Sequence, residues 1–377
     1  MRILYCISGI FSRGGMERTL INKANYLAEH CYDVIIVTTE QQDREPAYRL
    51  DKRIRLYDLN IGYSLNRTRF WLQKAYYFFY NRYLHKKRLS KLIKQVDPDI
   101  IISLFGNDAG IISRLQCRAK KILEFHFSRP LFHFSSRLGV LGLYDKWKST
   151  QWERMIRNFD RFVVLTYEDR ANWNKLNNVV VIPNARSFDC AHPALLEVHK
   201  VLAVGRYVWQ KGFDRLIQAW GLVNKKVDGW TLYIVGEGEL RSSLQRQIQQ
   251  LGLEQSIILT GSTAHIEDEY LSSSIFVQSS HFEGLSMALI ESMSCGLPVV
   301  SFACPCGPRD IITDSEDGFL VVDGDIEMMA NRLIYLMKHF DARKKMGEKA
   351  YNSSLRFTQD SVMRKWIALF NDVVNVK

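Results

Sequence analysis

Residues 274–303, SIFVQSSHFEGLSMALIESMSCGLPVVSFA, decide the fold, because a strand, a loop, a helix and a second strand follow one another within them. The apolar runs at the two ends predict buried strands. Ser286 suits the N-cap of a helix over about residues 287–295, and Gly296 suits its end. A helix that joins two buried strands predicts a parallel sheet covered by helices.

The same alternation of strand and helix continues on both sides of this stretch. It breaks near residues 179–193 and then starts again. Two such series predict an α/β protein with two doubly wound domains. Ligands of such sheets bind outside the carboxyl ends of the strands, so the expected site is a cleft between the domains. The other predicted strands are residues 2–8, 33–39, 99–105, 120–126 and 161–166 before the break, and 200–206, 230–236 and 256–261 after it.

The composition is that of an ordinary globular protein with an excess of positive charge. The 377 residues are 47% apolar and 24% charged, and the formal net charge is +11. This length is comfortable for two domains. The positive charge predicts an acidic partner, for which nucleic acid, anionic lipid and a phosphorylated substrate are the candidates.

Seven scattered cysteines predict reduced thiols and a cytosolic compartment, since a chain of this size needs no disulfides. Cys304-Pro305-Cys306 resembles half of a metal clip, but no second pair at zinc-finger spacing accompanies it, so we expect a structural loop. Residues 1–11 lack the cleavage site of a signal peptide. No apolar stretch reaches the ~20 residues that span a bilayer.

Two glutamates, Glu283 and Glu291, flank the start of the helix predicted at 287–295. Glu283 lies in the loop and Glu291 about two turns inside the helix, ~12 Å further along its axis. The free N–H groups of Gly284, Leu285 and Ser286 lie between them and form an expected anion site. This order of groups matches a sugar, a diphosphate and a ribose in line. The alternative is a capping acid followed by a solvated helix acid.

Three loops at strand ends add groups that suit phosphate binding. Arg206 and Lys211 follow one strand, where two cations can neutralise a diphosphate without a metal. The alternative for this pair is two solvated cations. The turn at Gly14 and Gly15 follows the first strand and brings backbone N–H groups close to a phosphate. A third turn, at Glu237, again joins a strand to a helix.

This combination resembles the retaining glycosyltransferases of family 4, which have the GT-B fold of two Rossmann-like domains. The resemblance covers nearly the whole chain, and its more specific motifs lie in the second half. The matching features are Gly14-Gly15 with Glu17, Arg206 and Lys211 in G-R-x4-K-G, Gly236-Glu237-Gly238, Glu283-x7-Glu291, IPNA at 182–185 and EDGFLV at 316–321.

The resemblance implies a role for each matching residue. It implies that Arg206 and Lys211 hold the donor diphosphate, that Glu291 binds the ribose, and that Glu283 contacts the transferred sugar. It makes His126, at the end of a predicted strand, the active-site histidine. The implied catalytic residues are His126, Glu283, Arg206 and Lys211, and the implied donor-binding residues are Gly14, Gly15, Arg206, Lys211, Glu237, Gly261, Glu283, Gly284, Leu285, Ser286 and Glu291.

The resemblance also divides the chain by function. It implies an acceptor-binding domain over residues 1–186 and a donor-binding domain over 187–357. It further implies that a helix within 358–377 packs back on the first domain. One residue departs from the pattern, because Asp310 stands where many relatives carry glutamate.

No metal or other cofactor is expected. Two D-x-D pairs, Asp97-Pro98-Asp99 and Asp323-Gly324-Asp325, are interpreted as turns. Glycosyltransferases of the GT-A fold hold a divalent metal with such a pair. Here Arg206 and Lys211 supply the positive charge instead.

The stretch from 66 to 94, NRTRFWLQKAYYFFYNRYLHKKRLSKLIK, interleaves cations with aromatic residues and contains no acid. We interpret it as a surface that docks on an anionic membrane. The alternatives are a helix whose aromatic residues face the core, and RNA binding, for which no accompanying motif exists. The expected docking residues are Arg67, Arg69, Trp71, Lys74, Arg82, Lys86, Lys87, Arg88, Lys91 and Lys94.

The resemblance implies transfer of a hexosyl unit from a nucleoside-diphosphate sugar, UDP-linked by preference, with retention at the anomeric carbon. The implied acceptor is a lipid-linked or polysaccharide glycan of the bacterial cell surface, at the cytoplasmic face of the inner membrane. No nucleic acid partner is expected. A sugar-nucleotide epimerase and a non-catalytic, membrane-associated partner subunit stay open as alternatives.

Overall fold

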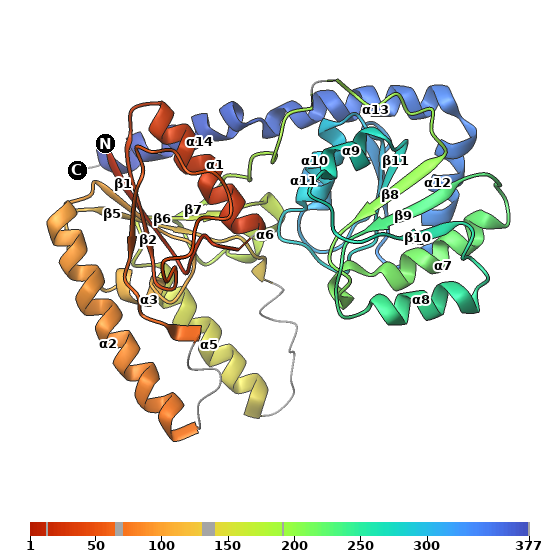
Figure 1. Ribbon diagram of the computed structural model, residues 1–377. Helices are drawn as coiled ribbons and strands as arrows, with labels where there is room; N and C mark the ends of the chain where they lie inside the picture. Colours follow the sequence, from red (N-terminus) through yellow and green to blue (C-terminus); the bar gives the residue numbers. More distant parts are fainter. Residues whose placement is uncertain (13, 65–70, 130–139, 191, 376–377) are drawn as a thin grey trace. The chain divides into compact units, whose positions relative to one another are not determined.

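The computed structural model describes residues 1–12, 14–64, 71–129, 140–190 and 192–375 (Figure 1). The chain forms two compact units. Unit 1 comprises Met1–Leu165, Arg170–Ile182 and Val362–Lys377, and unit 2 comprises Thr166–Asp169 and Pro183–Ser361. The residues from Val362 onward therefore belong to unit 1, although they follow all of unit 2 in the sequence.

Unit 1 is built on a parallel sheet of seven strands in the order β3-β2-β1-β4-β5-β6-β7. Its central strands are buried on both faces, which explains their uninterrupted apolar sequences. The strands are β1 (Arg2–Ile7), β2 (Asp33–Thr38), β3 (Arg55–Asp58), β4 (Ile100–Ser103), β5 (Lys120–Glu124), β6 (Arg161–Val164) and β7 (Val179–Val181).

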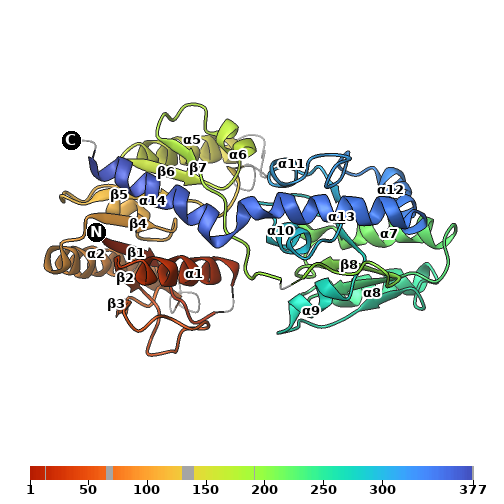
Figure 2. The ribbon, with the colours of Figure 1, turned by 90° about the horizontal axis from the view of Figure 1, so that it is seen from above.

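Helices cover both faces of this sheet. Figure 2 shows α1 and α14 on one face, and in Figure 1 α2, α3 and α5 lie on the other. Leu89, Leu92 and Ile93 of α2 join the core on that second face. The helices are α1 (Gly15–Glu29), α2 (Trp71–Val96), α3 (Ala109–Ile112), α5 (Val140–Ile156), α6 (Tyr167–Asn172), which continues from unit 2, and α14 (Gln359–Asn375).

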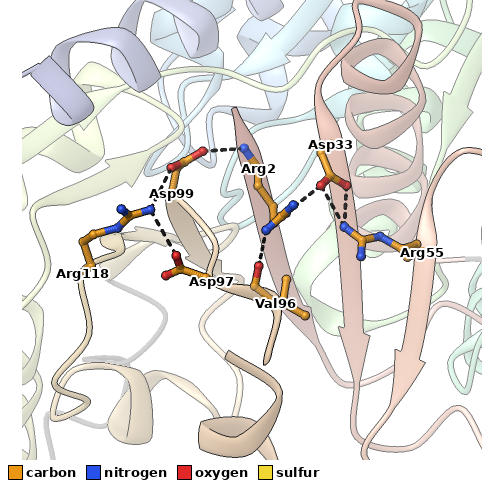
Figure 3. Close-up of polar contacts among 7 residues, drawn as sticks. All are labelled: Arg2, Asp33, Arg55, Val96, Asp97, Asp99 and Arg118. Atoms are coloured by element: carbon orange, nitrogen blue, oxygen red, sulfur yellow. Dashed lines mark hydrogen bonds and ion pairs between the residues drawn. The ribbon is translucent and has the colours of Figure 1, made fainter. Parts of the chain in front are cut away.

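Charged residues connect the strands of unit 1 at their amino ends (Figure 3). The amide of Arg2 donates to Asp99 over 2.7 Å, and its side chain donates to Asp33 over 2.6 Å. Arg55 also donates to Asp33, over 2.7 Å, and Arg118 lies 3.3 Å from Asp97 and 3.8 Å from Asp99. Both acids of the first D-x-D pair therefore have cationic partners, at the edge of the sheet opposite to the one where such sheets bind ligands.

Unit 2 contains a second parallel sheet, of six strands in the order β10-β9-β8-β11-β12-β13. Its core contains Trp220 of α7 and Phe302 of β12. The strands are β8 (Lys200–Val204), β9 (Thr231–Val235), β10 (Ile257–Leu259), β11 (Ile275–Gln278), β12 (Val299–Phe302) and β13 (Gly318–Val321). The helices are η2 (Trp209–Lys211), α7 (Phe213–Asn224), α8 (Arg241–Gln250), α9 (Ile266–Leu271), α10 (Met287–Ser294), α11 (Pro308–Ile311), α12 (Ile326–Lys338), α13 (Phe340–Ser354) and η3 (Leu355–Phe357).

The prediction of two doubly wound parallel sheets is confirmed. The expectation that the cysteines are reduced thiols is wrong for two of them, because Cys190 and Cys295 form a disulfide within unit 2. The two lie 105 positions apart, so their proximity depends on tertiary packing that the composition does not reveal. Cys6, Cys31, Cys117, Cys304 and Cys306 are free thiols. Within the described ranges, no helix is both long and apolar enough to cross a bilayer.

Candidate active site

The loop after β11 brings Glu283 and Lys211 into contact. Glu283 is only 5% exposed, and its carboxylate accepts hydrogen bonds from Lys211 Nζ at 2.8 Å and from Ser280 Oγ at 2.6 Å. Lys211 ends η2, which follows β8, the strand beside β11 in the sheet. Its aliphatic stem passes over Gly205, where a Cβ atom would lie 3.1 Å from Lys211 Cδ. The structure thus unites two of the residues implied as catalytic in a mostly buried ion pair.

Ser286 occupies the N-cap of α10, as predicted, but its side chain does not cap the helix. Its hydroxyl instead donates to the side-chain oxygen of the buried Gln278. Within the part of the chain that the structure describes, the amides of Gly284, Leu285 and Ser286 have no hydrogen-bond partner. These N–H groups lie at the positive end of the helix and are available to an anion.

Gly307 keeps this group of amides open. Its φ angle is +98°, and a Cβ atom there would lie 3.4 Å from the Ser286 amide nitrogen and 3.6 Å from Glu283 Cβ. A side chain at position 307 would therefore crowd the space in front of the amides. The glycine leaves room for a ligand to approach the backbone closely.

Glu291 lies on α10 and accepts a hydrogen bond from the hydroxyl of Tyr270 at 3.0 Å. Tyr270 lies on α9 and is fully buried, and burial raises the pKa of its hydroxyl well above the ordinary value, with a further contribution from Glu291. The hydroxyl therefore stays a donor and fixes the orientation of the carboxylate. Nothing in the local sequence around Tyr270 indicates this contact.

Arg206 and Glu237 lie at the carboxyl ends of β8 and β9. Arg206 is exposed, and its side chain has no hydrogen-bond or ion-pair partner among the described residues. Glu237 lies beside the loop after β10, because a Cβ atom on Gly261 would lie 3.4 Å from Glu237 Oε1. Tyr207 holds these loops together, since its buried hydroxyl lies 2.7 Å from the carbonyl oxygens of both Ile234 and Thr260.

The acid of the loop at 304–312, Asp310, is bonded to the start of α6. Asp310 accepts hydrogen bonds from the amides of Tyr167 at 2.7 Å and Glu168 at 3.2 Å. Arg309 forms an ion pair with Glu168 at 3.2 Å. Burial raises the pKa of Glu168, an effect that Arg309 partly opposes. Asp310 thus acts as a cap for α6.

The second D-x-D pair also has partners within unit 2. Asp323 accepts a hydrogen bond from Arg215 at 2.9 Å, and Asp325 caps α12 by accepting one from the Met328 amide at 2.9 Å. Among the residues that the structure describes, no group of three or more potential ligands could hold a metal ion.

His126 follows β5 in unit 1 and belongs to a buried charged cluster. Its Nε2 lies 3.2 Å from Glu124 Oε1, and the same oxygen accepts a hydrogen bond from Lys23. Lys23 is 3% exposed and Glu124 is 1% exposed. Burial raises the pKa of Glu124, but the charges of Lys23 and His126 outweigh it and lower the value to about 2. Glu124 therefore stays ionised beside the imidazole, although His126 Nε2 forms no hydrogen bond among the described residues.

Gly14 and Gly15 lie at the start of α1, where the sequence predicted a turn. Gly14 is the N-cap, and a Cβ atom there would collide with the carboxylate of Glu17 at 2.1 Å. Ser12 donates to Glu17 over 2.6 Å. The implied donor residues thus divide between the units, with Gly14, Gly15 and His126 in unit 1 and the others in unit 2.

The predicted docking residues lie on α2 as far as they are described. Tyr76, Phe79 and Tyr83 are 65%, 69% and 64% exposed, so the alternative in which the aromatic residues face the core is wrong for them. Arg88 donates to the Asn60 carbonyl over 2.9 Å and also to that of Leu59. Lys74, Lys86, Lys87, Lys91 and Lys94 are exposed and Arg82 is half-buried, whereas Arg67, Arg69 and the side chain of Trp71 lie outside the described residues.

Two family models match the chain one after the other. The model for glycosyltransferase family 4 matches residues 13–187, and the model for glycosyl transferases group 1 matches residues 192–353. The break between them coincides with the segment where the strand–helix pattern is interrupted in the sequence.

Curated relatives match over almost the full length. An uncharacterized glycosyltransferase of Haemophilus influenzae is 30% identical, with 97% of this chain and 98% of the relative covered. The amylovoran biosynthesis glycosyltransferase AmsD of Erwinia amylovora is 28% identical, with 99% of each chain covered. A Campylobacter jejuni N-acetylgalactosaminyltransferase, whose name places its acceptor glycan on PP-undecaprenol, is 24% identical, with 100% of this chain and 99% of the relative covered.

Solved structures share the fold at lower identity. Sucrose-phosphate synthase from Thermosynechococcus elongatus superposes with a TM-score of 0.81 at 17% identity, with 100% of both chains covered. The pneumococcal O-GlcNAc transferase GtfA, in complex with UDP and GlcNAc, superposes with a TM-score of 0.74 at 15% identity, with 100% of this chain and 99% of that one covered. Together with the matched family models and the Haemophilus relative, they show that the chain belongs to the family 4 glycosyltransferases and has the GT-B fold.

Proposed function

We propose that the protein transfers a hexosyl unit from a UDP-linked sugar, with retention at the anomeric carbon, to a lipid-linked or polysaccharide acceptor of the bacterial cell surface. The names of the Erwinia and Campylobacter relatives support a surface glycan as the product. The UDP bound by the pneumococcal structure supports a UDP-linked donor.

The observation that carries the proposal is the Lys211–Glu283 pair beside the unpaired amides of α10. A diphosphate in front of these amides would meet the helix N-terminus together with the ammonium group of Lys211. The guanidinium of Arg206, which has no partner among the described residues, adds a second cation. Charge that develops on the leaving diphosphate would then be stabilised by groups already in place.

Each further residue has a role that follows from its position. Glu283 would accept hydrogen bonds from hydroxyl groups of the transferred sugar, because both of its hydrogen bonds to described residues use the oxygen Oε1. Glu291, oriented by Tyr270, would accept them from the ribose. Glu237 and the loop at Gly261 would flank the base. His126 would contact the donor sugar from unit 1, and Gly14 and Gly15 would offer backbone N–H groups to it.

The reaction is proposed to need no metal and no other cofactor. Lys211, Arg206 and the helix amides supply positive charge where a metal-dependent enzyme would use a cation. The acids of both D-x-D pairs are engaged by Arg118, by Arg215 or by backbone amides. Activity that survives EDTA is the expected result, whereas dependence on added Mg²⁺ or Mn²⁺ would contradict it.

The protein is proposed to act at the cytoplasmic face of the inner membrane, held there by α2. The exposed lysines of α2 would meet anionic headgroups, and the exposed rings of Tyr76, Phe79 and Tyr83 would lie at headgroup level.

The experiment that tests the proposed reaction is a panel of UDP- and GDP-sugars, assayed first for donor hydrolysis and then for transfer to lipid-linked acceptors. We expect hydrolysis of a UDP-sugar, and an acceptor product whose anomeric configuration by NMR equals that of the donor. An inverted anomer would contradict retention. Epimerisation of the donor without transfer would contradict the proposal as a whole.

A further inference from the structure

Unit 1 contains a cavity of about 800 Å³ at the carboxyl ends of β1 and β4. It lies between α2, α3 and α5, which Figure 1 shows on one face of the sheet. Ser8 after β1 and Phe105 and Gly106 after β4 form its base. Carboxyl ends of neighbouring parallel strands are where doubly wound sheets bind ligands. We call this space the arginine cavity.

Three arginines from three segments line the arginine cavity: Arg82 of α2, Arg114 after α3 and Arg154 of α5. Within the described ranges, none of the three forms an ion pair with a carboxylate. The acid beside Arg154, Glu153, is occupied by Arg129 at 2.6 Å. Three cations thus line one cavity, and no acid is among the described residues that line it.

Arg82 lies close to His85 and Gly110, and its positive charge affects the pKa of the histidine. Burial, and after it the charge of Arg82, lower the pKa of His85 to about 4. Gly110 of α3 makes space for this guanidinium, because a Cβ atom there would lie 3.1 Å from Arg82 Nη2. The arginine is therefore held against α3 at the wall of the cavity.

Aromatic rings also line the cavity, beside polar side chains such as Asn107, Gln151 and Asn158. Phe78 of α2 and Trp152 of α5 line the cavity, and the Trp152 ring lies 5.6 Å from that of Phe105, edge to face. Flat apolar rings beside hydrogen-bond donors suit the two faces of a sugar ring. A second cavity of about 680 Å³ shares Ser8, Phe78 and Asn107 and adds both Lys74 and Glu40.

We propose that the arginine cavity binds the phosphate group of a phosphate-bearing acceptor glycan, with Arg82, Arg114 and Arg154 as its ligands. Guanidinium groups bind phosphate oxygens in pairs of parallel hydrogen bonds, and the aromatic wall receives the adjoining sugar. The proposal rests on the proposed glycosyltransfer. The new element is that the part of the acceptor that enters the arginine cavity carries a phosphate. This phosphate can belong to a lipid diphosphate or to a phosphodiester polymer.

The test first measures binding without catalysis. Inorganic pyrophosphate is titrated into the full chain by calorimetry in saturating UDP, which occupies the donor residues of unit 2. We expect wild-type protein to bind pyrophosphate more weakly as salt rises. We expect the variant Arg82→Gln/Arg114→Gln/Arg154→Gln to bind ~10-fold or more weakly than wild type. The matched control is Arg49→Gln/Lys52→Gln/Lys175→Gln, which removes the same charge from exposed positions elsewhere on unit 1.

A second variant guards against a folding defect. Arg114 is exposed, so Arg114→Gln alone should fold normally and lose part of the affinity, and Arg114→Lys should recover part of it. Equal affinity in wild type, the triple variant and the control would overturn the proposal.

Enzyme assays then test phosphate binding in the arginine cavity separately from the proposed transfer reaction. Donor hydrolysis without acceptor should be unchanged in the triple variant, while KM should rise for farnesyl-diphosphate-linked N-acetylglucosamine or for a glycerol phosphate oligomer. The substrate whose KM responds identifies the source of the phosphate. An unchanged KM for both acceptors would overturn the arginine cavity and leave the transfer reaction standing. Absence of donor hydrolysis in wild type would overturn the reaction, and the calorimetry would still decide the cavity.

Discussion

Lys211 forms an ion pair with Glu283 in the absence of a donor. An ammonium group has three donors, so one contact to the carboxylate leaves two for phosphate oxygens. This contact is mostly buried, because Glu283 is only 5% exposed. The two residues are therefore organised for a diphosphate on one side and a sugar hydroxyl on the other.

The first prediction concerns Lys211→Ala. It removes a cation from the leaving diphosphate, and kcat/KM should fall by ~10²–10³, the usual effect of deleting one electrostatic donor. Steady-state kinetics with the best donor of the panel measure it. The control Lys226→Ala removes an exposed lysine of the same unit and should retain wild-type rates. Equal rates for the two variants would contradict the assignment.

The second prediction concerns the buried Lys23–Glu124 pair. Glu124→Gln leaves the buried charge of Lys23 without its carboxylate, and Lys23→Met leaves Glu124 with only His126 beside it. Each should lower the free energy of unfolding by ~3–5 kcal/mol. The double variant should lose less than the sum of the single losses, because no orphaned charge remains. Urea unfolding at pH 7 measures all four proteins. Additive losses would show that the pair is not coupled.

The third prediction concerns the pH dependence of stability at Asp108. Burial raises the pKa of this carboxyl from 3.8 to about 6. The folded state therefore holds the proton more tightly than the unfolded state, and this group lowers stability as pH rises from about 4 to about 6. Asp108→Asn should raise the free energy of unfolding by ~1–3 kcal/mol at pH 8. The gain should vanish below about pH 4, and a gain equal at both pH values would contradict this cause.

At the scale of elements, the important part of α10 is its amino-terminal end, where backbone amides can bind a ligand. Its sequence predicts the start of the helix correctly, because Ser286 has the right residue type at the right place. It does not predict that the hydroxyl turns to Gln278, since that contact depends on where β11 places the glutamine. The outcome is a helix start whose amides remain available to a ligand.

The fourth prediction concerns Gly307→Ala. The added Cβ crowds the Ser286 amide, so UDP affinity should fall beyond what the loss of stability explains. The positive φ angle alone costs ~1–3 kcal/mol of stability. Gly324→Ala is the matched control, because its φ is +85° and its Cβ would meet only Arg215 Nη1, at 3.9 Å. Comparable UDP affinity in the two variants, measured by calorimetry, would contradict a role for the open amides.

The sequence predicted the strand–helix order better than it predicted the partners of its residues. Lys211 and Glu283 both follow buried strands, which placed them at one edge of a sheet. Their pairing needed the order β8-β11, which joins strands far apart in the chain. Tyr207 and Tyr270 carry no local signal, because each acts through a hydroxyl that meets another segment only in the folded unit.

At the scale of the whole molecule, positive charge gathers on one helix. α2 carries exposed lysines and exposed aromatic rings, while Arg88 on the same helix is used to hold the chain after β3 through two carbonyl oxygens. The structure thus separates the cations that are free to meet a membrane from one that supports the fold.

The fifth prediction is that the protein floats with anionic liposomes at low salt and is released at high salt. Replacing Lys86, Lys87, Lys91 and Lys94 with glutamine should abolish flotation, at ~1 kcal/mol for each cation. Arg88 is left in place so that the fold is preserved. The control replaces Lys225, Lys226, Lys344 and Lys345 of unit 2, which are also exposed. Flotation that is unchanged in the α2 variant would reject the docking surface.

The position of α14 in unit 1 has a consequence for synthesis on the ribosome. Trp366 of this helix lies over the ammonium group of Lys23, 4.1 Å from it, and Asp372 accepts a hydrogen bond from Arg161 at 2.7 Å. Both contacts join α14 to segments that are translated long before it. Unit 2 emerges complete while unit 1 still lacks this helix. Unit 1 therefore stays a nascent intermediate with Lys23 uncovered until α14 leaves the exit tunnel, so a helix made after unit 2 completes the unit that was begun before it.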